Sequence, residues 1–121
     1  TMLNHYNEYI NNSIMTSTPK DLILMLYDGC IKFINRAVIS IDNKDFAGSN
    51  ENILKAERII TELRSSLDMS YKVSADLDNL YSFFFSLLVQ SNISKDKECL
   101  LQLLPLIKDL RSTWAEAEKK A

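Results

Sequence analysis

Glycine and proline are scarce in this chain of 121 residues, which has two of each. An all-β domain needs many tight turns, and these two residue types form most of them, so the composition disfavours a β-sheet fold. A few long helices need far fewer turn residues. The length suits one domain with one core, and 46% hydrophobic with 25% charged residues is ordinary for a globular protein.

Residues that carry catalytic or metal chemistry are equally rare. The only histidine is His5, the two cysteines lie far apart in sequence, and two isolated glycines do not make a phosphate-binding loop. Acidic side chains such as Glu57 and Glu62 fall on what should be a solvated helix face. We therefore expect no catalytic residue, no metal site and no cofactor, and a protein that is not an enzyme.

Charge and hydropathy disfavour two further classes of partner. The formal net charge is −2, which gives no basic face for nucleic acid. The longest uncharged apolar run, residues 80–93, is too short to span a bilayer and contains serine and glutamine. The polar N-terminal region shows no secretory signal. We expect a cytosolic protein that neither binds nucleic acid nor inserts into a membrane.

Apolar residues recur at helical spacing in four segments, which we predict as helices over about 18–42, 45–67, 73–92 and 96–119. The first opens on Thr18-Pro19, where threonine is the expected cap and proline fits the first helical position, and Asp45 is the expected cap of the second. Short connections predict antiparallel neighbours, hence an all-α, up-down-up-down four-helix bundle over 18–121 with an N-terminal arm over 1–17. Pro105 predicts a kink or a break in the last helix.

The last three segments each carry one apolar seam of the kind that faces the centre of a bundle. The seams are Ile53, Ala56, Ile60, Leu63 and Leu67; Leu77, Leu80, Phe84, Leu87 and Ser91; and Leu100, Leu103, Ile107, Leu110, Trp114 and Ala117. The first segment has two adjacent stripes: Leu22, Leu26, Gly29, Phe33 and Ala37, and beside it Ile23, Tyr27, Cys30, Ile34 and Ile41.

This is more apolar surface than the interior of a four-helix bundle needs. The third segment in particular has no polar face around its middle, because it adds Tyr81, Phe83, Phe85, Leu88 and Val89 to its seam. The pattern leaves four explanations open: uneven packing that buries the surplus, cover by the N-terminal arm, a dimer surface, or a groove for an amphipathic partner helix.

Seven segments, in order and with the right gaps, resemble the FliS family of flagellar export chaperones. They are residues 6–9, 17–29, 32–37, 50–68, 77–81, 88–92 and 110–114. The resemblance implies an antiparallel four-helix bundle that binds the C-terminal segment of newly made flagellin in the cytosol. It further implies that binding prevents premature polymerisation and delivers flagellin to the flagellar export gate, without catalysis and without a cofactor.

The resemblance also implies a role for the arm. In the family an N-terminal aromatic or aliphatic pair folds over a hydrophobic cleft and is displaced by flagellin, and Tyr6 and Tyr9 occupy those positions here. From the apolar positions beside the seams we predict that the flagellin groove is lined by Ile23, Tyr27, Ile34, Leu54, Ile59, Tyr81 and Phe85.

The alternative is a homo-oligomeric helical structural or adaptor protein that buries the same surplus against a second copy. The sequence does not decide between a monomer and a homodimer, and it identifies neither the client flagellin nor a co-chaperone.

Overall fold

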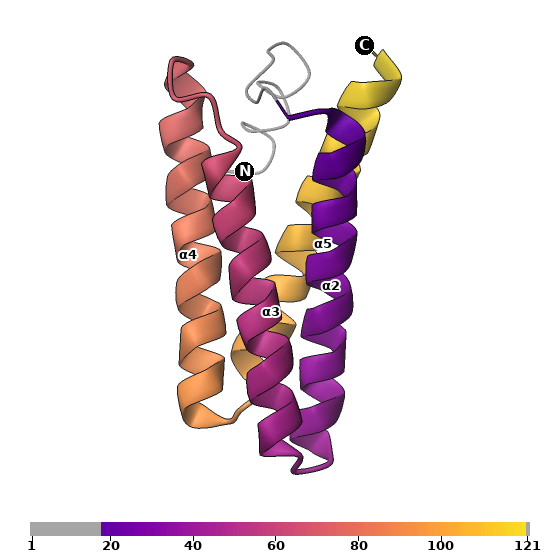
Figure 1. The fold of residues 1–121 in the computed structure, drawn as a ribbon, viewed down its shortest axis with the longest axis vertical. Coiled ribbons are helices and arrows are strands. Elements are labelled where there is room, and N and C mark those ends of the chain that lie inside the picture. Colours follow the sequence, from indigo (N-terminus) through magenta and orange to yellow (C-terminus); the bar gives the residue numbers. More distant parts are fainter. Residues whose placement is uncertain (1–17, 121) are drawn as a thin grey trace.

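Four α-helices make up the computed structural model, which describes residues 18–120 and the side chains of residues 18–116. They are α2 (Lys20–Asp42), α3 (Phe46–Ser65), α4 (Lys72–Ser94) and α5 (Glu98–Lys120). Successive helices run in opposite directions (Figure 1), and α2 and α4 each contact both α3 and α5. The predicted up-down-up-down bundle is confirmed. The predicted arm, with Tyr6 and Tyr9, lies outside the described residues.

The helix ends are set by short local hydrogen bonds. Helix α2 begins one residue later than predicted: Pro19, not Thr18, holds the N-cap position, and its carbonyl accepts hydrogen bonds from the backbone N–H groups of Leu22 and Ile23. Helix α3 begins as predicted, because the Asp45 side chain accepts a hydrogen bond of 3.0 Å from the Gly48 N–H. A carboxylate at this position satisfies an orphan donor and suits the positive end of the helix dipole.

Helix α5 runs without interruption past Pro105, so the break that was one of the two predicted outcomes is absent. Proline has no N–H to give to the preceding turn, which removes one hydrogen bond from the helix. Packing of the apolar seam on both sides of Pro105 holds the helix together across this position, since Leu103, Leu104 and Ile107 are all buried.

The core consists of one inward stripe from each helix. Every predicted seam residue of α3 and α4 is buried, and so are those of α5 through Trp114; the side chain of Ala117 lies outside the described part. In α2 the buried stripe is Ile23, Tyr27, Cys30, Ile34 and Ala37. Leu22, in the other stripe, is 48% exposed. Of the two stripes that the sequence offered for α2, the second therefore provides most of the core.

Helices α2 and α3 pack closely at a glycine. A Cβ atom at Gly29 would lie only 3.2 Å from Cδ1 of Ile59, so a larger residue would require the Ile59 side chain to shift by a few tenths of an ångström. This contact also fixes the position of Ile59, which lies at the α2–α3 interface. None of the described helices is long and apolar enough to cross a membrane.

Candidate binding groove between α3 and α4

Four of the seven predicted groove residues lie in the core instead. Ile23, Tyr27, Ile34 and Tyr81 are each at most 1% exposed, so in this structure their side chains offer no surface to a partner. The prediction treated them as lying beside the seams. The structure shows that the face of α2 containing Ile23, Tyr27 and Ile34 points inward. It also shows that the buried face of α4 is broad enough near the middle of the helix to include Tyr81 as well as Phe84.

The two buried tyrosines form a polar contact across the bundle. Their hydroxyl groups hydrogen-bond each other, which lets both rings enter the core without an unpaired hydroxyl. Burial raises the pKa of Tyr27 well above its ordinary value, with the neighbouring hydroxyl of Tyr81 adding to the effect, and burial likewise raises the pKa of Tyr81. The nearby indole N–H of Trp114 is buried without a hydrogen bond in the described structure. This contact belongs to the core rather than to a binding surface.

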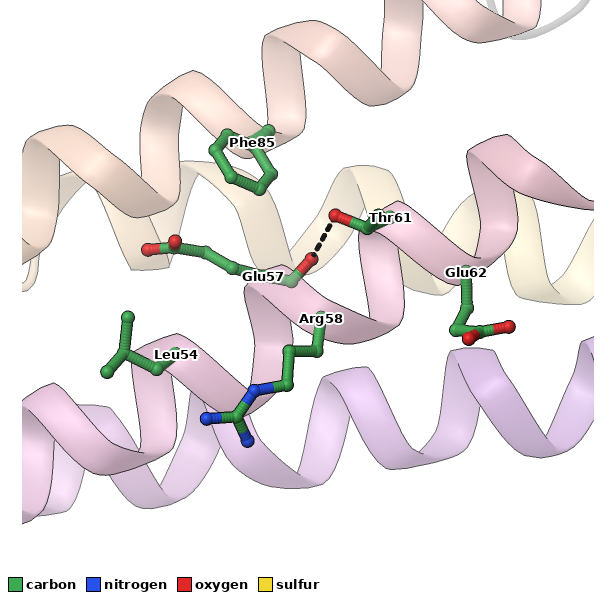
Figure 2. Close-up of a pocket in the computed structure, with 6 residues that line it drawn as sticks. All are labelled: Leu54, Glu57, Arg58, Thr61, Glu62 and Phe85. Carbon is green, nitrogen blue, oxygen red and sulfur yellow. Dashed lines mark hydrogen bonds between the residues drawn. The ribbon is translucent and has the colours of Figure 1, made fainter.

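The remaining three predicted residues are not fully buried, and two of them share a groove. Leu54 of α3 and Phe85 of α4 line an open groove of about 380 Å³ between these helices, together with Glu57, Arg58, Thr61 and Glu62. Figure 2 shows the Phe85 ring directed from α4 towards α3, with the Glu57 side chain extending below it. Leu54 is 37% exposed. Ile59, the seventh predicted residue, faces α2 and is not part of this groove.

The outer seam between α3 and α4 is built in three layers spaced by seven residues on each helix. At one end the Asn92 amide donates to Asn50 at 2.8 Å, and at the other Arg64 donates to Asp78 at 2.8 Å in an ion pair. Between them, Glu57 lies opposite Phe85 (Figure 2). The two outer layers therefore satisfy their polar groups across the seam, and the middle layer does not, which leaves the groove.

The middle layer places a carboxylate beside an aromatic ring. Burial raises the pKa of Glu57, because partial removal from water disfavours the charged form. Among the described residues the Glu57 carboxylate makes no hydrogen bond or ion pair; the Thr61 hydroxyl donates to the backbone oxygen of Glu57 at 3.0 Å and leaves the carboxylate free. The groove thus combines two apolar side chains, Leu54 and Phe85, with the half-buried carboxylate of Glu57, and more exposed polar side chains complete its lining.

Sequence reasoning missed the polar part of the groove. Glu57 and Glu62 were assigned to a solvated face, and this is right for Glu62, which is exposed, but wrong for Glu57, which is half-buried. The available signal was the seven-residue spacing of Asn50, Glu57 and Arg64, which places them on one edge of α3. That edge differs from the apolar seam, so a search for apolar periodicity passes over it.

Further apolar side chains are exposed elsewhere on the bundle. Nine large ones are 38–74% exposed: Leu22, Met25, Ile39, Phe46, Met69, Tyr71, Phe83, Ile93 and Leu101. Phe33 on α2 is partly buried and has three cationic side chains near its ring, those of Lys32, Arg36 and Lys55, at 4.6–5.8 Å from the centroid. Within residues 18–116, no group of three histidine, cysteine or acidic side chains could hold a metal ion.

An all-α bundle with an open groove between two helices and many exposed apolar side chains has features that are typical of helical modules that bind other proteins. Comparison with known proteins makes the class specific. The family model described as "Flagellar protein FliS" matches residues 2–121. The chain is 40% identical over 114 residues to the flagellar secretion chaperone FliS of Bacillus subtilis, covering 94% of this chain and 86% of that protein.

Two more distant relatives carry the same description. The flagellar secretion chaperone FliS of Campylobacter jejuni is 29% identical over 113 residues, with 92% of this chain and 88% of that protein covered. The corresponding protein of Salmonella typhimurium is 26% identical over 115 residues, with 93% and 85% covered. The chain therefore belongs to the FliS family of flagellar secretion chaperones, and its role is that of an export chaperone, which is not an enzyme.

Proposed function

We propose that this chain binds the C-terminal segment of flagellin and uses the groove between α3 and α4 as one of the contact sites. The observation that carries the proposal is the unclosed middle layer of the α3–α4 seam. There the exposed Leu54 and the partly buried Phe85 line an open groove between two layers that are closed by polar contacts. Apolar side chains spaced along a groove are what an amphipathic helix needs for docking.

The distribution of exposed apolar side chains supports a client that wraps around the bundle. They occur on all four helices, with Leu22 and Met25 on α2, Phe83 on α4 and Leu101 on α5 as examples. A segment that folds as it binds must offset the loss of its own conformational entropy, so it needs a large contact area. We expect the complex to bury more than roughly 2,000 Å² in total.

Tyr6 and Tyr9 are proposed as a lid. A short intramolecular segment can cover apolar surface in the free protein, and a longer client that buries more area then displaces it. Binding of the C-terminal segment would keep flagellin from polymerising prematurely in the cytosol and would present flagellin to the export gate. Replacing both tyrosines by alanine should strengthen client binding several-fold, because the client no longer competes with the lid.

Calorimetry at several temperatures tests the proposal, with the C-terminal segment of the source organism's flagellin as titrant. We expect a one-to-one complex and a large negative heat-capacity change, which reports buried apolar surface. Leu54→Ala and Phe85→Ala should each weaken binding about tenfold, the effect of losing roughly 1.4 kcal/mol from an apolar anchor. Gln102→Ala is the control, because this exposed polar side chain of α5 neither lines the groove nor belongs to the exposed apolar side chains.

The outcomes separate the proposal from the alternative. No binding at any temperature would remove flagellin as the client. A homo-oligomeric structural protein would instead show a concentration-dependent dimer in light scattering that does not change when flagellin is added. A monomer that becomes a heterodimer supports the chaperone.

A further inference from the structure

We infer that the client segment seated in the α3–α4 groove carries a lysine or arginine next to its apolar anchor, and that this cation pairs with the carboxylate of Glu57. The inference rests on the proposed function, because it specifies the chemistry of the segment that the groove accepts. The occupant is a helical peptide segment with one apolar side chain against Phe85 and Leu54 and one basic side chain within reach of Glu57.

Charge complementarity is the basis of this inference. Neither neighbouring layer supplies a cation to Glu57. Arg64 is held by Asp78 with contacts of 2.8 and 3.4 Å, and in the other layer the Lys95 ammonium donates to the amide oxygen of Asn92 at 2.6 Å. At its own layer α4 contributes only the phenyl ring of Phe85. The charged groups that remain are Arg58 and Glu62.

Both of these belong to α3, and neither is directed at the Glu57 carboxylate. Figure 2 shows the Arg58 guanidinium and the Glu62 carboxylate pointing away from Phe85, while the Glu57 side chain extends below the ring. The carboxylate of Glu57 is therefore the charged group that faces the groove. Because the lining contains two carboxylates, Glu57 and Glu62, and one guanidinium, Arg58, its net charge is negative.

A client that covers this groove removes Glu57 further from water. Burying a carboxylate without a partner is costly, whereas a charge-assisted hydrogen bond to lysine or arginine offsets the loss of hydration. A purely apolar client would therefore bind more weakly, because it buries the Glu57 carboxylate without a partner. A client with a cation near Glu57 would form an ion pair with it. The groove would therefore bind this client more tightly than an apolar segment of similar size.

Replacing the carboxylate by its neutral isostere distinguishes the two cases by sign. With the flagellin C-terminal segment as probe, Glu57→Gln should weaken binding about tenfold or more if a cation is paired, since the variant loses a charge-assisted hydrogen bond. If the client is only apolar at this position, the same variant should tighten binding. Glu116→Gln is the control: it removes an exposed carboxylate of α5 that does not line the groove, and its effect should stay within about threefold.

The pH dependence gives a second readout with opposite signs. Pairing with a cation lowers the pKa of Glu57 in the complex below its value in the free protein, so affinity should fall as pH falls through the free-protein pKa. Burial without a cation raises that pKa further, so affinity should rise instead. Glu57→Gln should abolish whichever dependence belongs to this residue and leave any contribution from titratable groups of the peptide.

Substitution in the peptide identifies the partner cation. Replacing each basic residue of the segment by glutamine in turn should locate one whose loss weakens wild-type binding about tenfold and has little further effect in Glu57→Gln. Tighter binding by Glu57→Gln, or independent effects of every peptide substitution, would overturn the inference while leaving the proposed function intact. Failure of the wild-type protein to bind the segment at all would instead remove the proposed function.

Discussion

The hydrogen bond between Tyr27 and Tyr81 should make each hydroxyl dependent on the other. Both side chains are at most 1% exposed, so water cannot replace a lost partner. Tyr27→Phe or Tyr81→Phe alone leaves one buried hydroxyl with its main partner removed. Replacing both removes the two polar groups together and leaves a core with aromatic rings of nearly unchanged shape.

The magnitude follows from the cost of an unpaired buried group. Each single variant should lose about 1–3 kcal/mol of unfolding free energy, the typical desolvation penalty of a buried hydroxyl. The double variant should lose clearly less than the sum of the two, and its loss should be similar to or smaller than that of either single variant. Among the described residues the buried indole N–H of Trp114 has no hydrogen-bond partner. It lies near both hydroxyls and can donate to a surviving one, so the single variants should lie in the lower half of this range.

Urea unfolding of the four proteins, followed by circular dichroism, completes the double-mutant cycle. The wild type, both single variants and the double variant must show equal m-values for the comparison to hold. A coupling energy of at least about 1 kcal/mol is expected. Additive losses, with the double variant as unstable as the sum of the singles, would show that the two hydroxyls do not satisfy each other in solution and would refute the reasoning.

Two further predictions concern stability. Gly48→Ala should fail to give the gain of about 1 kcal/mol that alanine usually brings to a helix, because its Cβ would lie 2.3 Å from Oδ2 of Asp45 and displace the capping side chain. In an Asp45→Ala background the same substitution should raise the free energy of unfolding, as measured by urea unfolding. A gain in stability in the wild-type background would contradict this account. Stability should also fall as pH rises above about 9, because burial raises the pKa of the Cys30 thiol from 9.0 to about 12 and raises that of both core tyrosines, so the folded state retains protons that the unfolded chain releases. Unfolding at pH 8, 9 and 10 should show a shallower decline in Cys30→Ala, and an unchanged slope would mean that this thiol is not protected by the core.

The sequence was sufficient to predict the fold because each helix carries its own signals. Few turn residues, a capping aspartate at Asp45 and seams such as Ile53 to Leu67 all indicate the same bundle, and the structure has each of these features. The start of α2 was off by one residue because threonine and proline are both good first-turn residues. The choice between them depends on backbone geometry that composition does not specify.

The candidate site was harder to predict because burial depends on the neighbouring helices. Ile23 and Leu22 are adjacent and equally apolar, yet one is 1% and the other 48% exposed, and only the rotation of α2 in the bundle decides which faces inward. The groove also depends on the one layer of the α3–α4 seam whose side chains make no polar contact with each other. The mismatch of Glu57 with Phe85 is visible only when the register of the two helices is known.

Cross-linking from within the groove tests the central claim most directly. A photoreactive phenylalanine analogue at position 85 should cross-link to the flagellin C-terminal segment at one defined stretch of the peptide, next to its basic residue. The same analogue at position 102, an exposed polar position of α5 outside the groove, serves as the comparison. Equal cross-linking from both positions, or cross-linking from 102 alone, would contradict docking of the client between α3 and α4.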